Sequence, residues 1–177
     1  TEAVLFAARV LKHERNASEA MRRSALSVTA DSQFALQRYA EAETAYADEI
    51  KLLPAKSPER AALTEQLAAS IYKQGESARA KGDMRAAARQ FQRVGDTVPD
   101  ASIRATAQYD AAAAFIQLQD WPNAEKQLEA FRAEHPNHTL IADVDKKLAV
   151  AYQADNKPDL AAAAFQRIAG RSAETGD

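Results

Sequence analysis

The sequence contains no cysteine, so neither a disulfide framework nor thiolate chemistry is available to it. Glycine and proline are scarce, at 5 and 6 of 177 residues, and helix-breaking positions are therefore few. Aromatic residues make up only 7% of the chain, too few for one bulky core. No apolar run approaches the roughly 18–20 residues that span a bilayer, so no membrane-spanning segment is expected.

An excess of charge of one sign is also missing. The 23 basic and 25 acidic residues leave a formal net charge of −2, which argues against a nucleic-acid binder that needs a broad positive field. Arg85, Arg89 and Arg93 lie four apart on one predicted helix face, but no aromatic residues alternate with them to stack bases. We expect a solvated helix face there and no nucleic-acid partner.

Alanine, by contrast, supplies about a quarter of the residues. It is the best helix former, and its small side chain lets helices approach closely. A chain with many alanines and few large residues is typical of a helical repeat array, in which each unit packs on its neighbours.

An internal repeat confirms this expectation at the level of the sequence, because three blocks superimpose at a constant offset of 37 residues. Small and large apolar residues keep their places in each block. The equivalent sets are Ala87, Ala124 and Ala161; Phe91, Leu128 and Phe165; Val94, Phe131 and Ile168; and Gly75, Ala112 and Ala149.

An earlier, degenerate copy aligns Ala42, Tyr46 and Pro54 to the same frame, with 45 residues between Ala42 and Ala87. The opening segment matches only the second half of a unit. We therefore predict one solenoid with these parts: a half repeat over 1–15, repeats over 17–54, 57–99, 100–136 and 139–170, and a frayed tail over 171–177.

The predicted helices have recognisable ends. Ser57, Asp100 and Thr139 are side chains that can accept hydrogen bonds from first-turn amides, so they predict helix starts. Gly82 and Asn156 suit the left-handed conformation that stops a helix. Because the turns are short, neighbouring helices must be antiparallel.

These positions resemble the tetratricopeptide repeat (TPR), whose signature is an ordered set of small and large apolar residues closed by proline. The resemblance implies an all-α, right-handed α-solenoid of about four repeats plus a half repeat. It departs from the family in its spacing of 37 rather than about 34 residues. The large residue at the start of each first helix is also replaced, by Ile71, Gln108 and Asp145.

Residues 128–168 look more narrowly like envelope-associated TPR proteins of Gram-negative bacteria, in the style of the outer-membrane assembly lipoprotein and the Tol-Pal-linked division coordinator. That similarity implies a periplasmic or outer-membrane-associated adaptor; a cytoplasmic location is the alternative. Because the chain begins at Thr1 rather than a methionine, we expect it to be part of a longer protein.

No pattern for catalysis is found. The histidines are His13, His135 and His138, and the last two stand three apart in an HPNH run that could suggest a metal pair. The proline breaks the helix there and no third ligand is near in sequence, so a capped loop is the better reading. Gly-rich phosphate loops and nucleophile motifs are missing. We expect no enzyme, no metal and no cofactor.

The resemblance implies that the first helix of each unit lines a concave groove for a protein or peptide partner. Tyr72 and Tyr109, which are 37 apart, offer the rigid amphipathic surface common at interface hot spots; alternatively, both pack between first helices. The predicted groove residues are Tyr72, Glu76, Arg79, Tyr109, Ala113, Ile116, Gln117, Lys146, Val150 and Gln153.

The two ends predict a second surface, because Val4, Leu5 and Phe6 at one end and Phe165 and Ile168 at the other lack outer covers. Self-association through these ends is therefore expected if no further repeats follow. Three functions stay open: a scaffold for a partner protein, a structural or oligomerisation segment, and a regulatory arm of an enzyme whose catalytic domain lies outside these residues.

Overall fold

The computed structural model describes residues 2–13 and 16–175, so residues 14–15 of the predicted half repeat and 176–177 of the predicted tail lie outside the described residues. The described part contains nine α-helices and no strand. Their bounds are α1 Glu2–His13, α2 Glu19–Ala35, α3 Tyr39–Leu52, α4 Glu59–Ala80, α5 Met84–Thr97, α6 Arg104–Gln117, α7 Trp121–Glu134, α8 Ile141–Ala154 and α9 Pro158–Thr175.

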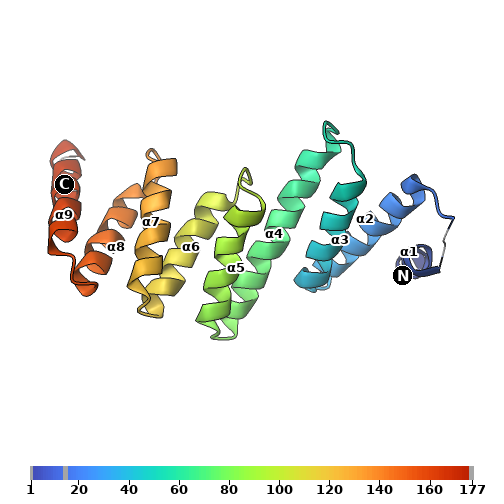
Figure 1. Cartoon of the computed structure of the whole chain (residues 1–177), viewed down its shortest axis with the longest axis horizontal. Coiled ribbons are helices and arrows are strands. Elements are labelled where there is room, and N and C mark those ends of the chain that lie inside the picture. Colours follow the sequence, from blue (N-terminus) through green and yellow to red (C-terminus); the bar gives the residue numbers. More distant parts are fainter. Residues whose placement is uncertain (1, 14–15, 176–177) are drawn as a thin grey trace.

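The helices form a single row that follows the order of the chain, from α1 at one end to α9 at the other (Figure 1). Each helix packs mainly on the helix before it and the helix after it. The row consists of α1 followed by the pairs α2–α3, α4–α5, α6–α7 and α8–α9. The predicted all-α solenoid of helix pairs is therefore confirmed.

A left-handed residue closes the first helix of every pair. Gly82 has a φ of 80°, and Asn156 has a φ of 56°, as their residue types predicted. Gln37 and Gln119 take the same conformation, with φ values of 60° and 57°. Successive turns from Gly82 onward are thus 37 residues apart, and the first is 45 residues before Gly82, which reproduces the register of the sequence repeat.

Side-chain caps occur at the start of α2, where Ser18 accepts a hydrogen bond from the amide of Met21, and at two of the second helices. Asp83 and Asp120 each accept a hydrogen bond from a first-turn amide of α5 and α7, respectively. The predicted caps at Asp100 and Thr139 are wrong, because α6 and α8 begin further along the chain and have no side-chain cap. Ser57 does not cap α4 with its side chain either.

Two helices are longer than the repeat predicts. Helix α4 has 22 residues whereas α6 and α8 have 14 each, and the extra turns at its start account for the longer offset between the first two full repeats. Helix α9 continues past Gly170, so residues 171–175, expected to be a frayed tail, are helical.

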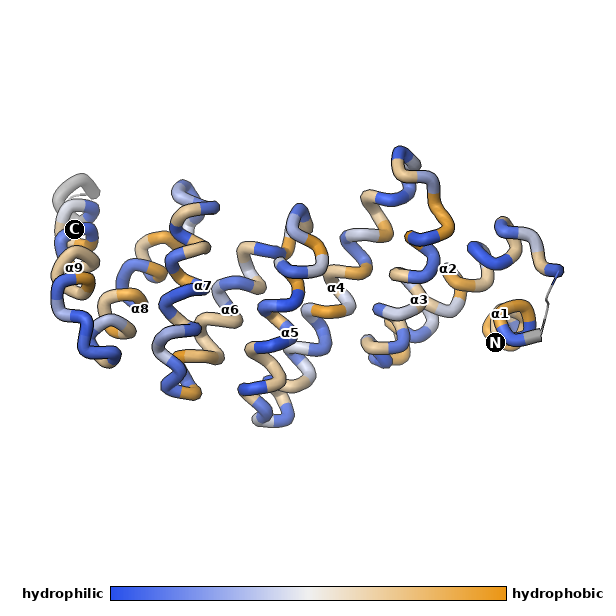
Figure 2. The backbone as a smooth tube through the Cα atoms, in the orientation of Figure 1, coloured by the Kyte–Doolittle hydropathy of each residue, from blue (hydrophilic) through white to orange (hydrophobic). Residues whose placement is uncertain are grey.

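The core is spread along the row instead of gathered at one centre, as the apolar stretches in every helix of Figure 2 show. The repeated alanines lie inside it: Ala87 and Ala124 are fully buried, and Ala161 is 3% exposed. Phe91 and Leu128 fill the space beside them. These positions confirm that the recurring small residues let paired helices pack closely.

Gly75 shows how tight this packing is. A Cβ atom on Gly75 would lie 2.6 Å from two atoms of the buried Phe91 ring, far closer than real contacts. The ring in turn packs on Tyr72, with 5.1 Å between the ring centroids. Later repeats carry alanine at this position, and a leucine replaces Phe91 opposite Ala112.

We expect Gly75→Ala to destabilise the array by about 1–3 kcal/mol, because the buried ring must move and this overpacking outweighs the better helix propensity of alanine. Urea unfolding followed by circular dichroism measures the change. Gly95→Ala is the matched control, since its Cβ would meet Arg104 at an ordinary 3.5 Å and should leave stability unchanged or slightly higher. Equal effects of both substitutions would show that the ring contact is not limiting.

Candidate functional site

The predicted groove residues lie on one face of each first helix, at spacings of three or four residues on α4, α6 and α8. Their exposure differs widely. Tyr72 is buried; the half-buried members are Glu76, Arg79, Tyr109, Ala113 and Ile116; and the exposed members are Gln117, Lys146, Val150 and Gln153.

The two equivalent tyrosines connect one repeat to the next. The hydroxyl of Tyr72 on α4 donates a hydrogen bond to Asp110 of α6, with 2.5 Å from Oη to Oδ2. The hydroxyl of Tyr109 on α6 donates in the same way to Asp143 of α8, also at 2.5 Å. Both rings therefore pack between first helices, which was the alternative to a role as exposed anchors.

The environment keeps these phenols protonated. Burial raises the pKa of Tyr109 to about 12, together with the hydrogen bond to Asp143 and the charge of that carboxylate. Burial and the hydrogen bond to Asp110 raise the pKa of Tyr72 as well. Each tyrosine therefore remains a hydrogen-bond donor over the whole physiological pH range.

Charged side chains on α4 add to the same junction. Glu76 lies between two cations: Lys73 Nζ is 2.6 Å from Glu76 Oε2, and Arg79 Nη2 is 4.0 Å from Oε1. Arg79 also reaches Asp110 of the next repeat, with 3.2 Å between Nη1 and Oδ1. Arg79 thus helps to hold α4 against α6, whereas Glu76 is engaged by two cations of its own helix.

Two open hollows accompany the predicted groove residues. The first, of about 510 Å³, is lined by Glu76 and Arg79 and by neighbours on α4 and the α2–α3 turn. The second, of about 380 Å³, lies between α8 and the start of α9 and includes Gln153 and the half-exposed Phe165. The part of the face with free apolar surface is on α8, where Val150 is 53% exposed.

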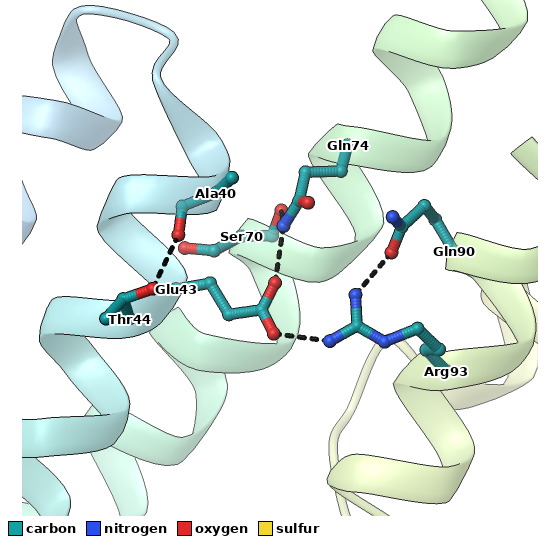
Figure 3. A network of polar contacts seen from close by, with 7 residues as sticks. All are labelled: Ala40, Glu43, Thr44, Ser70, Gln74, Gln90 and Arg93. Carbon is teal, nitrogen blue, oxygen red and sulfur yellow. Dashed lines mark hydrogen bonds and ion pairs between the residues drawn. The ribbon is translucent and has the colours of Figure 1, made fainter. Parts of the chain in front are cut away.

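A second polar network lies where α3, α4 and α5 meet (Figure 3). Glu43 accepts a hydrogen bond from Gln74 at 2.6 Å and pairs with Arg93 at 2.5 Å. Arg93 also donates to Gln90 at 2.6 Å. One member of the arginine row on α5 is therefore committed to a contact between helix pairs rather than to an external anion.

The HPNH run forms a closed loop between α7 and α8. His138 Nδ1 accepts a hydrogen bond from the amide of Leu140 at 3.1 Å, as expected for a capped loop. The rings of His135 and His138 both pack against Phe131, at 5.2 and 5.1 Å between centroids. Within residues 2–13 and 16–175, no group of three histidine, aspartate or glutamate side chains is arranged to hold a metal ion.

Three acidic side chains are buried among the described residues, and none of them was predicted to be functional. Glu125 is paired with Lys157, at 2.5 Å, and Asp145 with Arg167, at 3.1 Å. Glu49 on α3 is only 5% exposed and has no ion-pair partner among the described residues. Applying the same 45-residue offset to Val94 would have revealed Glu49, because the later repeats have the apolar residues Val94, Phe131 and Ile168 at this position.

The ends of the row carry some of the exposed apolar side chains predicted there, whereas Val4 and Ile168 are half-buried and Ile168 packs against the core. Leu5 and Phe6 on α1 are 74% and 61% exposed, and Phe165 on α9 is 47% exposed. Phe165 is equivalent to Phe91 on α5 and Leu128 on α7. Residues of α6 and α8, the first helices that follow α5 and α7, share the core clusters of Phe91 and Leu128 and help to cover them. As for the membrane, no helix in the described part combines the length and the apolar character needed to cross one.

The chain is similar to one protein family and to several solved structures. The family model described as outer membrane lipoprotein (YfiO) matches residues 64–145, a little under half of the chain. No curated protein sequence matches. The crystal structure of MamA protein is similar with a TM-score of 0.52 and 14% identity, covering 87% of this chain and 93% of MamA.

Two further structures match with lower TM-scores. The Podosopora anserina kinesin light chain with nearly identical TPR-like repeats has a TM-score of 0.45 and 20% identity, covering 99% of this chain and 87% of its own. BtubC (BKLC) from P. vanneervenii has a TM-score of 0.43 and 19% identity, covering 97% and 71%.

The helix pairs and their 37-residue register establish an all-α solenoid with TPR-like helix pairs, and the likeness to MamA supports this fold. Over residues 64–145 the chain resembles the outer membrane lipoprotein family, in keeping with the predicted resemblance to envelope-associated TPR proteins.

Proposed function

We propose that the chain is a non-catalytic scaffold that binds a partner protein or peptide along its first helices. The observation that carries this proposal is the free surface of α6 and α8: Gln117, Lys146, Val150 and Gln153 are exposed, and the array does not use them for its own packing. An exposed apolar side chain between a cation and an amide offers both apolar area and polar contacts to a partner.

We further propose that the work of this scaffold is in the bacterial envelope, in the periplasm or at the outer membrane. The support is the match of residues 64–145 to a family described as an outer membrane lipoprotein. The hydrogen bonds of Tyr72 and Tyr109 and the ion pair between Arg79 and Asp110 support this proposal, because they fix the spacing of the first helices that present the surface.

Val150→Asp should reduce partner capture by at least about fivefold, which corresponds to about 1 kcal/mol of binding free energy, because a charge replaces the central apolar contact. A photo-activatable cross-linker at the position of Gln153 captures the partner from an envelope fraction, and mass spectrometry quantifies the yield.

Ala169→Asp is the matched control, since it places the same charge at an exposed alanine of α9, away from the proposed surface. Equal capture by the wild-type chain and both variants would overturn the assignment of the surface. Capture of further copies of the chain alone would favour the second candidate, a self-associating structural segment, which the exposed Leu5, Phe6 and Phe165 at the two ends support.

A further inference from the structure

Glu49 is a buried acidic side chain that forms no salt bridge within the described residues. Only 5% of the residue is exposed, its Oε2 atom makes no hydrogen bond, and no cation of residues 2–13 and 16–175 forms an ion pair with it. The other buried acids of the described residues are each paired with a basic side chain: Glu125 with Lys157 of the α8–α9 turn, and Asp145 with Arg167 of α9. Burying a charge without a partner is costly, so Glu49 requires an explanation.

The repeat makes this residue more unusual still. Glu49 precedes Val94 by 45 residues, the same offset that separates Ala42 from Ala87. Val94 and its equivalent Phe131 are fully buried apolar residues. A residue that breaks the rule of its own repeat, at a cost in stability, is expected where the chain has a task other than folding.

Glu49 lines an open hollow of about 640 Å³ between α2, α3 and α4. The volume lies within the roughly 300–1,000 Å³ that is typical of ligand sites. The apolar part of the lining includes Val28, Ala62 and Leu63, and Ser24 adds a hydroxyl. The extra turns at the start of α4 supply Ala62 and Leu63, so the hollow is a product of the longer helix that sets this repeat apart.

The charges around the hollow favour a cation. Arg23 stands at the rim and pairs with Glu59, which leaves Glu49 without a salt bridge. Burial raises the pKa of Glu49, the charge of Arg23 lowers it, and the charges of Asp31 and Glu59 raise it again. The hollow is thus lined by two acidic side chains, Glu49 and Glu59, and by one arginine, which pairs with Glu59. An added cation would neutralise the remaining negative charge of Glu49.

We propose that the hollow between α2, α3 and α4 receives a lysine or arginine side chain of the partner protein, whose cation pairs with Glu49 while its alkyl stem packs on the apolar lining. This inference rests on the proposed function, since the cation belongs to the bound protein. It adds a second contact point, one repeat or more away from the α6–α8 surface.

Three small probes test the site on the 177-residue chain: Nα-acetyl-lysine amide and Nα-acetyl-arginine amide, whose side chains keep their charge, and the uncharged Nα-acetyl-norleucine amide. NMR titration should give saturable shifts at Ser24, Ala62 and Leu63 with one or both cationic probes and none with norleucine. Whether lysine or arginine binds more tightly identifies the partner's residue. Binding of all three probes alike, or of none, would overturn the proposal.

Variants separate the charge from the shape of the hollow. Glu49→Gln should weaken binding of the cationic probe at least about tenfold, because it keeps the size and removes the charge. Arg23→Met should strengthen it, because it removes the competing cation from the rim. Glu49→Val, which restores the residue type of the other repeats, should abolish binding and raise the melting temperature of the array.

The outcomes also distinguish this inference from the proposed function. Unchanged partner capture by Glu49→Val would sink the cation site and leave the scaffold function standing. Probe binding that depends on Glu49, combined with no partner captured by the wild-type chain, would refute the scaffold function and the partner as the source of the cation, while showing that the hollow binds a cationic side chain. If Glu49→Val raised the melting temperature and the wild-type chain bound no probe, Glu49 would only destabilise the array, and the site would be refuted.

Discussion

Replacing Arg167 and Arg171 together with methionine is expected to destabilise the array by up to about 3–5 kcal/mol, because it removes the two nearest of the three basic side chains that pair with a fully buried carboxylate. Asp145 on α8 lies 3.1 Å from Arg167 Nε and 3.0 Å from Arg171 Nη1, both on α9. Arg132 of α7 is further away, at 3.8 Å. Methionine keeps much of the apolar stem of arginine, so the loss is mainly of charge.

The decisive comparison is the same double replacement in an Asp145→Leu chain. Ile71 occupies the equivalent position two repeats earlier and is fully buried, so an aliphatic residue fits the frame of the repeat. Without the buried carboxylate, the partly exposed arginines can turn to water, and their loss should cost less than about 1 kcal/mol. Urea unfolding of the four chains gives the coupling energy. Equal costs in both backgrounds would mean that the arginines act by packing alone.

The register of the repeat was predictable because it depends on size. Where two helices cross closely, only alanine fits, so Ala87, Ala124 and Ala161 mark the crossings in the sequence itself. The turns were only half predictable. Gly82 is a residue type that signals the left-handed conformation, whereas Gln119 adopts it because the repeat requires a turn there.

The partners of polar side chains were not predictable, because they depend on how one repeat is rotated against the next. The 37-residue spacing places Tyr72 and Tyr109 on equivalent faces, but it does not say whether the rings point outward or between helices. The structure turns both inward, toward Asp110 and Asp143. Asp145 is a departure from the family pattern that is visible in the sequence. The arginines that pair with it lie on α7 and α9, and their proximity to Asp145 depends on how these helices pack.

Raising the pH through the range 10 to 12 is expected to unfold the array, because the hydroxyls of four of the five tyrosines donate a hydrogen bond to a carboxylate on another helix. Deprotonation of a tyrosine removes its donor. Each phenolate would leave a buried or half-buried negative charge beside a second one. The donor–acceptor pairs are Tyr46 with Asp31, Tyr72 with Asp110, Tyr109 with Asp143, and Tyr152 with Glu129.

The direction follows from proton linkage. Burial and the hydrogen bond raise the pKa of Tyr109 in the folded chain to about 12, whereas a tyrosine in the unfolded chain has a pKa near 10. The folded state therefore binds the proton more tightly. This contribution to stability is complete below pH 10 and is lost as the pH rises toward 12. Ultraviolet absorbance of tyrosinate and circular dichroism should change in one joint transition.

Single substitutions assign the effect to a hydrogen bond. Tyr109→Phe should lose about 0.5–1.5 kcal/mol at neutral pH, where the bond to Asp143 is intact, and should lose less further stability than the wild-type chain between pH 10 and 12. Tyr39→Phe is the control, because its ring packs edge-on against Phe34 and, within the described residues, its hydroxyl donates to no carboxylate. If Tyr109→Phe followed the same pH dependence as the wild-type chain, the link between the first helices would not control alkaline stability.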